Sequence, residues 1–278
     1  MPDDEIDVAL GAALVARDTY DALDVAALLA ELHDLGAPLA PPEGARHGAE
    51  GAVDDRSLRE RVTAVSELFA GLGFRGNTEN YYDPKNSLLP DVLARRTGIP
   101  ITLSIVWCAL AKRAGLLARG IAFPGHFLVR VDATSSVESG RMPLLVDPFH
   151  DGRILDDESA TALLRRALGE GAELHPALVA PASARVTLVR LLTNLEAIYG
   201  KRGEHARAFI AIDRIVTLVP DSARMLRERA ALALRIGATE VARSDLARVL
   251  ELEPEAPDAA AIEARLAKLA PTAKSTLH

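Results

Sequence analysis

The chain has 278 residues, of which 49% are hydrophobic and 26% are charged, and its 32 basic and 39 acidic side chains give a formal net charge of −7. This composition excludes a disordered or fibrous protein and is sufficient for one large or two small hydrophobic cores. The acidic balance, without a dense Lys/Arg block, argues against general binding to nucleic acid or to an anionic membrane.

The single cysteine, Cys108, indicates a reducing compartment, because it cannot form an internal disulfide and leaves no cysteine cluster for zinc. The first residues, MPDDEID, are acidic where a secretory signal is basic. The longest uncharged apolar stretch, residues 98–111, is shorter than the roughly 20 residues of a membrane-spanning helix. We therefore expect a cytoplasmic protein, and we expect no cofactor.

Three amphipathic helices are predicted in the first 70 residues. Apolar side chains recur at three- and four-residue spacing over residues 4–17, 24–33 and 56–70, and Asp24 is a suitable N-cap for the second helix. Residues 37–53 contain three prolines and three glycines and are predicted to form a surface loop.

The following segment has two parts of different character. Residues 74–87, FRGNTENYYDPKNS, are rich in turn-forming side chains and lead into a predicted helix that ends near Arg96. Residues 101–114 are apolar on nearly every side. A helix of that kind is buried, so we expect it to be the central helix of the domain.

After this helix the apolar period changes from about 3.6 to 2. The runs ARGIAF (118–123), HFLVRV (126–131) and PLLVDPF (143–149) are short and bounded by Gly or Pro. They predict three antiparallel strands packed on the central helix. Residues 156–168 return to a helical pattern, and residues 169–184 are predicted to connect two domains.

The last third contains an internal repeat of 34 residues. The pairs that recur at this spacing are Gly203/Gly237, Ala208/Ala242, Leu218/Leu252 and Pro220/Pro254. This is the period of the tetratricopeptide helix-turn-helix unit, and it predicts helices over 189–201 and 205–218 and a capping helix over 258–269. The predicted fold is α+β: a core of helices and a small antiparallel sheet in residues 1–182, then an α-solenoid in residues 183–278.

Packing positions within the repeat follow from the same register. Seven side chains at its large and small positions are expected to face between helices: Leu195, Tyr199, Ala208, Ile212, Leu226, Ala242 and Leu246.

The middle of the chain resembles a known family. The segments GNTENYYDPKNS, GIPITLS, PGHF and VDPF are similar to those of the SirB-type transglutaminase-like family, uncharacterised bacterial proteins that join such a core to tetratricopeptide repeats. The resemblance covers nearly the whole chain. It implies a papain-like α+β core and very little about a substrate.

The resemblance also implies a catalytic arrangement. Enzymes of the wider superfamily place a cysteine at the start of a buried helix, a histidine on the next strand and an aspartate on the strand after that. Here His126 and Asp147 match the histidine and the aspartate in type and order, and we expect them to be within hydrogen-bonding distance. They are either an acid–base dyad or a structural pair that joins two strands.

The nucleophile position departs from the superfamily pattern. The start of the central helix has no cysteine, and Cys108 lies more than a turn further along, where we expect it to be buried and unreactive. Thr102 and Ser104 are hydroxyls near the helix start that could replace the thiol or could serve as caps. The candidate catalytic residues are therefore His126, Asp147, Thr102 and Ser104.

Two further groups of polar residues could bind a ligand. Asn77, Tyr81, Tyr82, Asn86 and Ser87 could line a cleft, although capping explains part of this pattern. His150, taken with His126 and Asp147, would supply ligand types that suit zinc or iron.

Three functions remain open from the sequence. The first is a non-catalytic or regulatory protein-interaction module that binds a protein or peptide through its repeats. The second is an acyl-transfer or amide-hydrolysing enzyme with a Thr or Ser nucleophile. The third is a sensor of a small ligand or metal. The missing cysteine favours the first.

Overall fold

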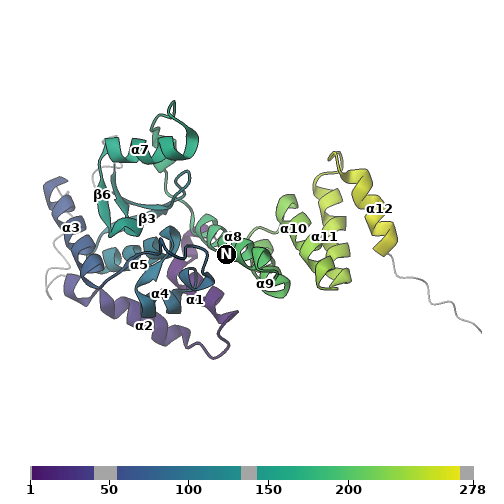
Figure 1. Cartoon of the computed structure of the whole chain (residues 1–278), viewed down its shortest axis with the longest axis horizontal. Helices are drawn as coiled ribbons and strands as arrows, with labels where there is room; N and C mark the ends of the chain where they lie inside the picture. The colour runs from purple at the N-terminus through teal and green to yellow at the C-terminus, as the bar shows by residue number, and fades with distance from the viewer. Residues whose placement is uncertain (1, 41–54, 133–142, 270–278) are drawn as a thin grey trace, which may run out of the picture. The chain divides into compact units, whose positions relative to one another are not determined.

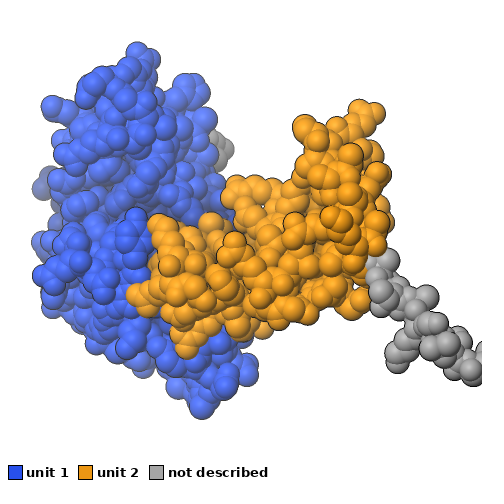
Figure 2. Space-filling model, turned by 45° about the vertical axis from the view of Figure 1, so that its right-hand side comes forward, with its two compact units in different colours: residues 1–191 blue, residues 192–278 orange. Residues whose placement is uncertain are grey.

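The computed structural model describes residues 2–40, 55–132 and 143–269, and the chain forms two compact units, residues 1–191 and 192–278 (Figures 1 and 2). The first unit combines helices with small sheets, and the described part of the second is helical, which confirms the predicted α+β core followed by helical repeats. The loop predicted for 37–53 lies outside the described residues from residue 41 onward. Among the described residues, no helix has the length and apolar character needed to span a bilayer.

The first unit contains six α-helices that lie within it in the described ranges: α1 (Val8–Arg17), α2 (Val25–Leu35), α3 (Asp55–Gly71), α4 (Leu89–Arg95), α5 (Pro100–Arg113) and α7 (Asp157–Leu168). Asp24 caps α2 as predicted, with its carboxylate accepting from the Ala27 N–H at 3.0 Å. Asp7 caps α1 in the same way. Such caps satisfy backbone donors that have no partner within the helix.

Helix α5 is the central helix, as its sequence predicts. It contacts α2 and α3 and also strands of the larger sheet (Figure 1). Leu103, Trp107 and Leu110 are fully buried along it. The Trp107 indole N–H donates to the Ser66 hydroxyl of α3 at 3.3 Å, so the one polar atom of this large side chain has a partner.

The larger sheet has four antiparallel strands in the order β3 (Leu117–Ile121), β4 (Leu128–Asp132), β5 (Leu144–Asp147) and β6 (Arg153–Leu155). Successive side chains along each strand point to opposite faces of this sheet. Val129 and Val146 belong to the core that contains α5, while Leu128 and Leu145 belong to a second cluster with α7. The three predicted strands are confirmed, and β6 is an additional strand that the sequence interpretation did not identify.

Two very short strands connect the polar loop to the central helix. β1 (Arg75–Gly76) pairs in parallel with β2 (Thr97–Gly98), which ends two residues before α5. This pairing holds the segment that follows α3 beside the start of α5.

The second unit is built from repeated helix pairs. Helix α8 (Ala184–Lys201) starts in the first unit and ends in the second, and four helices follow it: α9 (His205–Leu218), α10 (Ala223–Arg235), α11 (Thr239–Leu252) and α12 (Ala259–Leu269). The two turns at Gly203 and Gly237 have φ values of 73° and 80°, which glycine adopts without strain. All seven side chains predicted to face between the helices are buried.

The pH dependence of stability should reveal a buried carboxylate at the end of β4. Asp132 accepts from Arg130 Nε at 2.8 Å and from Arg119 Nη2 at 2.9 Å. Burial alone would raise the pKa of Asp132, but hydrogen bonds and charges from the two arginines outweigh it and hold the pKa below its usual value. A lowered folded-state pKa stabilises the protein above the unfolded-state pKa, and this contribution is lost as the pH falls through the folded-state pKa.

Asp132→Asn is therefore expected to lower the free energy of unfolding by about 2 kcal/mol at pH 6, which is the typical contribution of a hydrogen bond to a charged group. The difference from wild type should shrink as the pH falls below about 4, the ordinary pKa of aspartate. Urea unfolding of both proteins between pH 6 and pH 2 measures it. A constant difference over this range would contradict the assignment.

Candidate functional site

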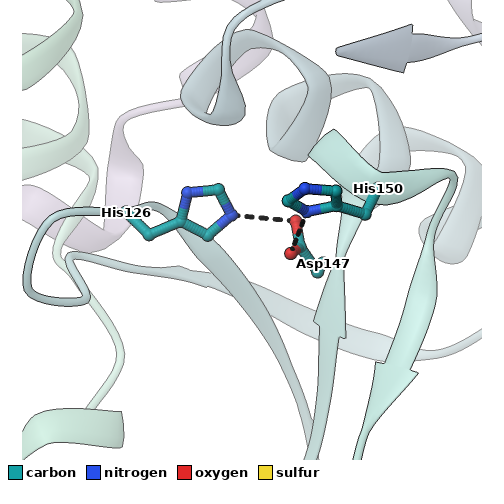
Figure 3. Close-up of side chains that lie close together, drawn as sticks. All are labelled: His126, Asp147 and His150. Atoms are coloured by element: carbon teal, nitrogen blue, oxygen red, sulfur yellow. Dashed lines mark hydrogen bonds and ion pairs between the residues drawn. The ribbon is translucent and has the colours of Figure 1, made fainter. Parts of the chain in front are cut away.

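The candidate site is organised around Asp147, the last residue of β5, which is fully buried. His126 Nε2 lies 2.9 Å from Asp147 Oδ1, and His150 Nδ1 lies 2.7 Å from Asp147 Oδ2 (Figure 3). An ionised carboxylate only accepts hydrogen bonds, so both imidazoles donate to it. The Phe149 backbone N–H donates to Oδ1 at 3.1 Å as a third partner.

The local sequence explains how His150 reaches Asp147. Pro148 begins a 3-10 turn, Pro148–His150, for which Asp147 is the N-cap. In a 3-10 helix the side chains at i and i+3 lie above one another, so His150 stacks over the residue three positions before it. Asp151 and Gly152 then adopt positive φ values of 58° and 74° and lead the chain into β6.

His126 reaches the same carboxylate from a turn that precedes β4. Gly125 has φ 67°, and the His126 N–H donates to the Phe123 carbonyl at 3.0 Å. Because β4 and β5 are antiparallel neighbours, the first residues of β4 lie beside the last residues of β5, at the same end of the strands. Arg190 of α8 donates to the His126 carbonyl at 2.8 Å. The predicted hydrogen bond between His126 and Asp147 is confirmed, but His126 was predicted to begin the strand and instead lies in the turn before it, since β4 starts at Leu128.

Two opposing effects act on the pKa of Asp147. Burial alone would raise it, but the hydrogen bonds and charges of His126, and then those of His150, outweigh burial and hold the pKa below its usual value. Asp147 therefore remains a carboxylate at neutral pH and orients both rings.

An asparagine network holds the polar loop next to this cluster. Asn77 Nδ2 donates to Asn86 Oδ1 at 3.0 Å, and Asn86 Nδ2 donates to the carbonyls of Asn80 and Tyr81 at 2.8 and 3.2 Å. Asn86 is fully buried, so its amide supports the loop from within. Ser87 is also buried, and its hydroxyl has no hydrogen-bond partner among the described residues.

The two tyrosines of this loop lie on its outer side. Tyr81 is 41% exposed and Tyr82 60% exposed, and their rings pack edge to face with centroids 5.3 Å apart. Tyr81 also contacts the Phe149 ring at 6.2 Å, and Phe149 contacts the His126 ring at 5.9 Å. The His150 ring packs edge to face on Phe149, with centroids 5.3 Å apart. We call Tyr81, Tyr82, His126, Phe149 and His150 the aromatic cluster. It joins the predicted cleft-lining tyrosines to the histidines.

Burial also affects Tyr81. Burial raises the pKa of its hydroxyl, the neighbouring Tyr82 raises it further, and the positive charge of Arg190 acts in the opposite direction with the smallest effect. The Tyr81 hydroxyl is therefore neutral at physiological pH and can donate a hydrogen bond.

The Thr102 hydroxyl has a structural role. It donates to the Asn86 carbonyl at 2.7 Å and accepts from the Ile99 N–H at 3.2 Å, so it caps α5 and joins it to the polar loop. Thr102 is fully buried.

Ser104 and Cys108 lie further along α5. Ser104 is 1% exposed, and its Oγ has no hydrogen-bond partner among the described residues. Cys108 has intermediate exposure as a residue and packs against the core, so the predicted burial is confirmed only in part. Burial of the thiol nevertheless raises the pKa of Cys108 to about 12.

The raised pKa predicts a slow thiol. Because the thiolate is the reactive form, Cys108 should react with a disulfide reagent at least about a hundredfold more slowly in the native chain than in urea. Stopped-flow labelling at pH 7.5 measures both rates. Equal rates in the two conditions would show that α5 does not protect the thiol.

Two residues of the site were not identified from the sequence. Phe149 was seen only as part of a strand, and Arg190 was assigned to the repeats, whereas it contacts the His126 carbonyl and lies over the Phe127 ring. The signal for His150 was its position three residues after Asp147. No local pattern indicates Arg190, because its contact joins residues 64 positions apart.

His126, Asp147 and His150 offer three potential metal-ligand atoms within 4.8 Å of one another.

Known protein families match this chain in two segments, one for each compact unit. A family model described as the transglutaminase-like superfamily matches residues 26–193, and one described as a tetratricopeptide repeat matches residues 195–267. The chain is 38% identical to a UPF0162 protein of Xylella fastidiosa strain 9a5c over 248 residues, which cover 87% of this chain and 83% of that protein.

Two further relatives differ in how much of their length is matched. The UPF0162 protein of Pseudomonas aeruginosa is 32% identical over 228 residues, covering 82% of this chain and 81% of the relative. Human F-box only protein 21 is 28% identical over 178 residues, 61% of this chain but 27% of that protein. This chain therefore belongs to the transglutaminase-like superfamily, with the UPF0162 proteins as relatives along most of its length.

Proposed function

We propose that this chain is a non-catalytic protein-recognition module, in which a transglutaminase-like core has kept the His–Asp pair and lost the nucleophile. The observation that carries the proposal is the condition of the three candidate nucleophiles on α5. Covalent catalysis requires a nucleophile that is accessible to the substrate and that has either a free hydroxyl or a reactive thiolate. Each of the three candidates lacks at least one of these properties.

Each candidate fails for a separate reason. The Thr102 hydroxyl is buried and already engaged with the Asn86 carbonyl and the Ile99 N–H. Ser104 is buried, with its Oγ away from solvent. The pKa of Cys108 is raised to about 12, which leaves almost no thiolate at neutral pH. A histidine and a carboxylate without a nucleophile orient one another but do not transfer an acyl group.

Two surfaces support recognition of a protein. Tetratricopeptide units stack into arrays that present an extended surface for peptides or helices, and the family model for this repeat matches residues 195–267. In the core, Tyr81 and Tyr82 are partly exposed beside His126 and Phe149. Tyrosine is enriched where proteins bind one another, because its large ring loses little conformational entropy and its hydroxyl bonds at the rim.

A serine-dependent acyl transferase is the second candidate. It is favoured by one observation, the Ser104 Oγ without a hydrogen-bond partner among the described residues. An unpartnered buried hydroxyl is unusual in a folded protein. This candidate requires α5 to expose Ser104 to a substrate, and for that reason it ranks below recognition.

Site-specific photo-cross-linking tests the proposal. A benzophenone amino acid replaces Tyr82, which is 60% exposed, and in a control chain it replaces Arg56, whose side chain is 89% exposed. In cells of the source organism, position 82 is expected to give a discrete protein adduct that position 56 does not. Excess wild-type chain should compete for the adduct, and excess Tyr82→Asp chain should not.

A parallel assay separates recognition from catalysis. Incorporation of a fluorescent amine into glutamine peptides, and hydrolysis of their amides, should be equal for wild type, Ser104→Ala and buffer alone. Turnover that Ser104→Ala abolishes would replace the proposal with the serine enzyme. Absence of a competed adduct at position 82 would remove the aromatic cluster from the recognition surface.

A further inference from the structure

We propose that His126, Asp147 and His150 form a binding site for a divalent transition metal of the zinc class. The observation behind the proposal is the second histidine. An acid–base dyad uses one imidazole and one carboxylate, whereas here two imidazoles converge on the two oxygens of one buried carboxylate. The proposal does not depend on the recognition function.

The geometry is close to that of a three-ligand site. The three potential ligand atoms all lie within 4.8 Å of one another. In a tetrahedral site with metal–nitrogen bonds of about 2.1 Å, two nitrogen ligands lie about 3.4 Å apart. A movement of up to about 1.4 Å at one ring therefore completes the set. The metal takes the place of the two ring N–H protons that now bond to Asp147, and these protons leave to solvent. The His150 side chain is 53% exposed and can make this movement, while His126, at 12%, is held more firmly.

The surroundings orient the ligands as in known metal sites, where neighbouring groups fix each ligand. The Phe149 N–H holds Asp147 Oδ1, and the carboxylate is the N-cap of the 3-10 turn that carries His150. Arg190 donates to the His126 carbonyl and so fixes the backbone of that ligand from outside the cluster.

The ligand types select the metal class. Two imidazole nitrogens with one carboxylate oxygen suit Zn²⁺, Fe²⁺ or Co²⁺, whereas Mg²⁺ and Ca²⁺ take oxygen ligands. Three protein ligands leave a fourth position of a tetrahedral zinc site for water or for a group from a bound partner. The exposed side of His150 gives the metal a route from solvent.

Metal titration of the purified full chain, without an affinity tag and after treatment with a chelator, tests the site. Calorimetry with Zn²⁺ should give one ion per chain, and Co²⁺ should give the visible absorption of a tetrahedral complex. His150→Ala and Asp147→Asn are each expected to weaken binding at least about tenfold. His33→Ala is the matched control, because His33 is exposed on α2, and its binding should equal that of wild type.

The half-exposed His150 makes the test decisive, since in the described part of the chain its hydrogen bond is to one oxygen of Asp147, and its removal should leave the fold intact. Circular dichroism confirms that each variant is folded. The proposal is overturned if the wild-type chain binds neither Zn²⁺ nor Co²⁺, or if folded His150→Ala binds them with unchanged strength.

Discussion

Arg229→Met is expected to destabilise the second unit by about 3–5 kcal/mol, because it leaves a buried carboxylate without its partner. Arg229 of α10 donates through Nε and Nη2 to both oxygens of Asp245 in α11, at 2.8 and 2.6 Å. The side chain of Asp245 is 3% exposed and that of Arg229 is 17% exposed, so solvent screens this pair weakly. A third bond, at 2.6 Å, joins Arg229 to Asp213 of α9.

Hydrogen exchange of α10 and α11 in the full chain measures the loss as a lower free energy of local opening. Arg224→Met is the matched control, since Arg224 pairs with Glu228 on an exposed face with its side chain 72% exposed. Its expected cost is below about 0.5 kcal/mol. The double variant Arg229→Met, Asp245→Leu should recover most of the stability, because no buried charge is left unpaired. Equal effects of Arg229→Met and Arg224→Met would show that Asp245 keeps its hydration.

Elements with a strong local pattern could be predicted from the sequence. The central helix was predicted at 101–114 and lies at Pro100–Arg113, and the second repeat helix lies at His205–Leu218 as predicted. The central helix is apolar on nearly every side, the repeat helix has regular apolar spacing, and both have clear boundaries at Pro or Gly. The strands β1, β2 and β6 are two or three residues long, which is too short for a period to be visible.

The core of the candidate site followed from a resemblance, and its surroundings did not. His126 and Asp147 match a pattern of residue type and order, which a sequence displays directly. The contacts of Phe149 and Arg190 depend on how distant elements pack. The predicted domain boundary at 182/183 lies just before α8, while the compact units divide at 191/192, because Leu188 meets Gly11 and Leu191 is buried in the core of the first unit.

Gly76→Ala is expected to destabilise the first unit by about 2–3 kcal/mol and to displace the turn that carries His150. A Cβ on Gly76 would lie 2.6 Å from two carbons of the Phe149 ring and 2.6 Å from the Phe149 carbonyl oxygen. The ring could rotate, but the carbonyl belongs to the Pro148–His150 turn and moves only with it. Because Asp147 caps this turn, the hydrogen bond between His150 and Asp147 should weaken together with the fold.

Gly71→Ala provides the matched control for this prediction. Gly71 is the last residue of α3, and a Cβ there would meet no atom within 4 Å. In a helix, alanine is favoured over glycine by about 0.5–1 kcal/mol, so this variant should be as stable as wild type or slightly more stable. Urea unfolding of both variants gives the stability difference, and NMR of the imidazole nitrogens reports the hydrogen bonds of His126 and His150. If Gly76→Ala leaves both the unfolding midpoint and the His150 signals unchanged, the close packing of β1 against the Phe149 carbonyl does not position the site.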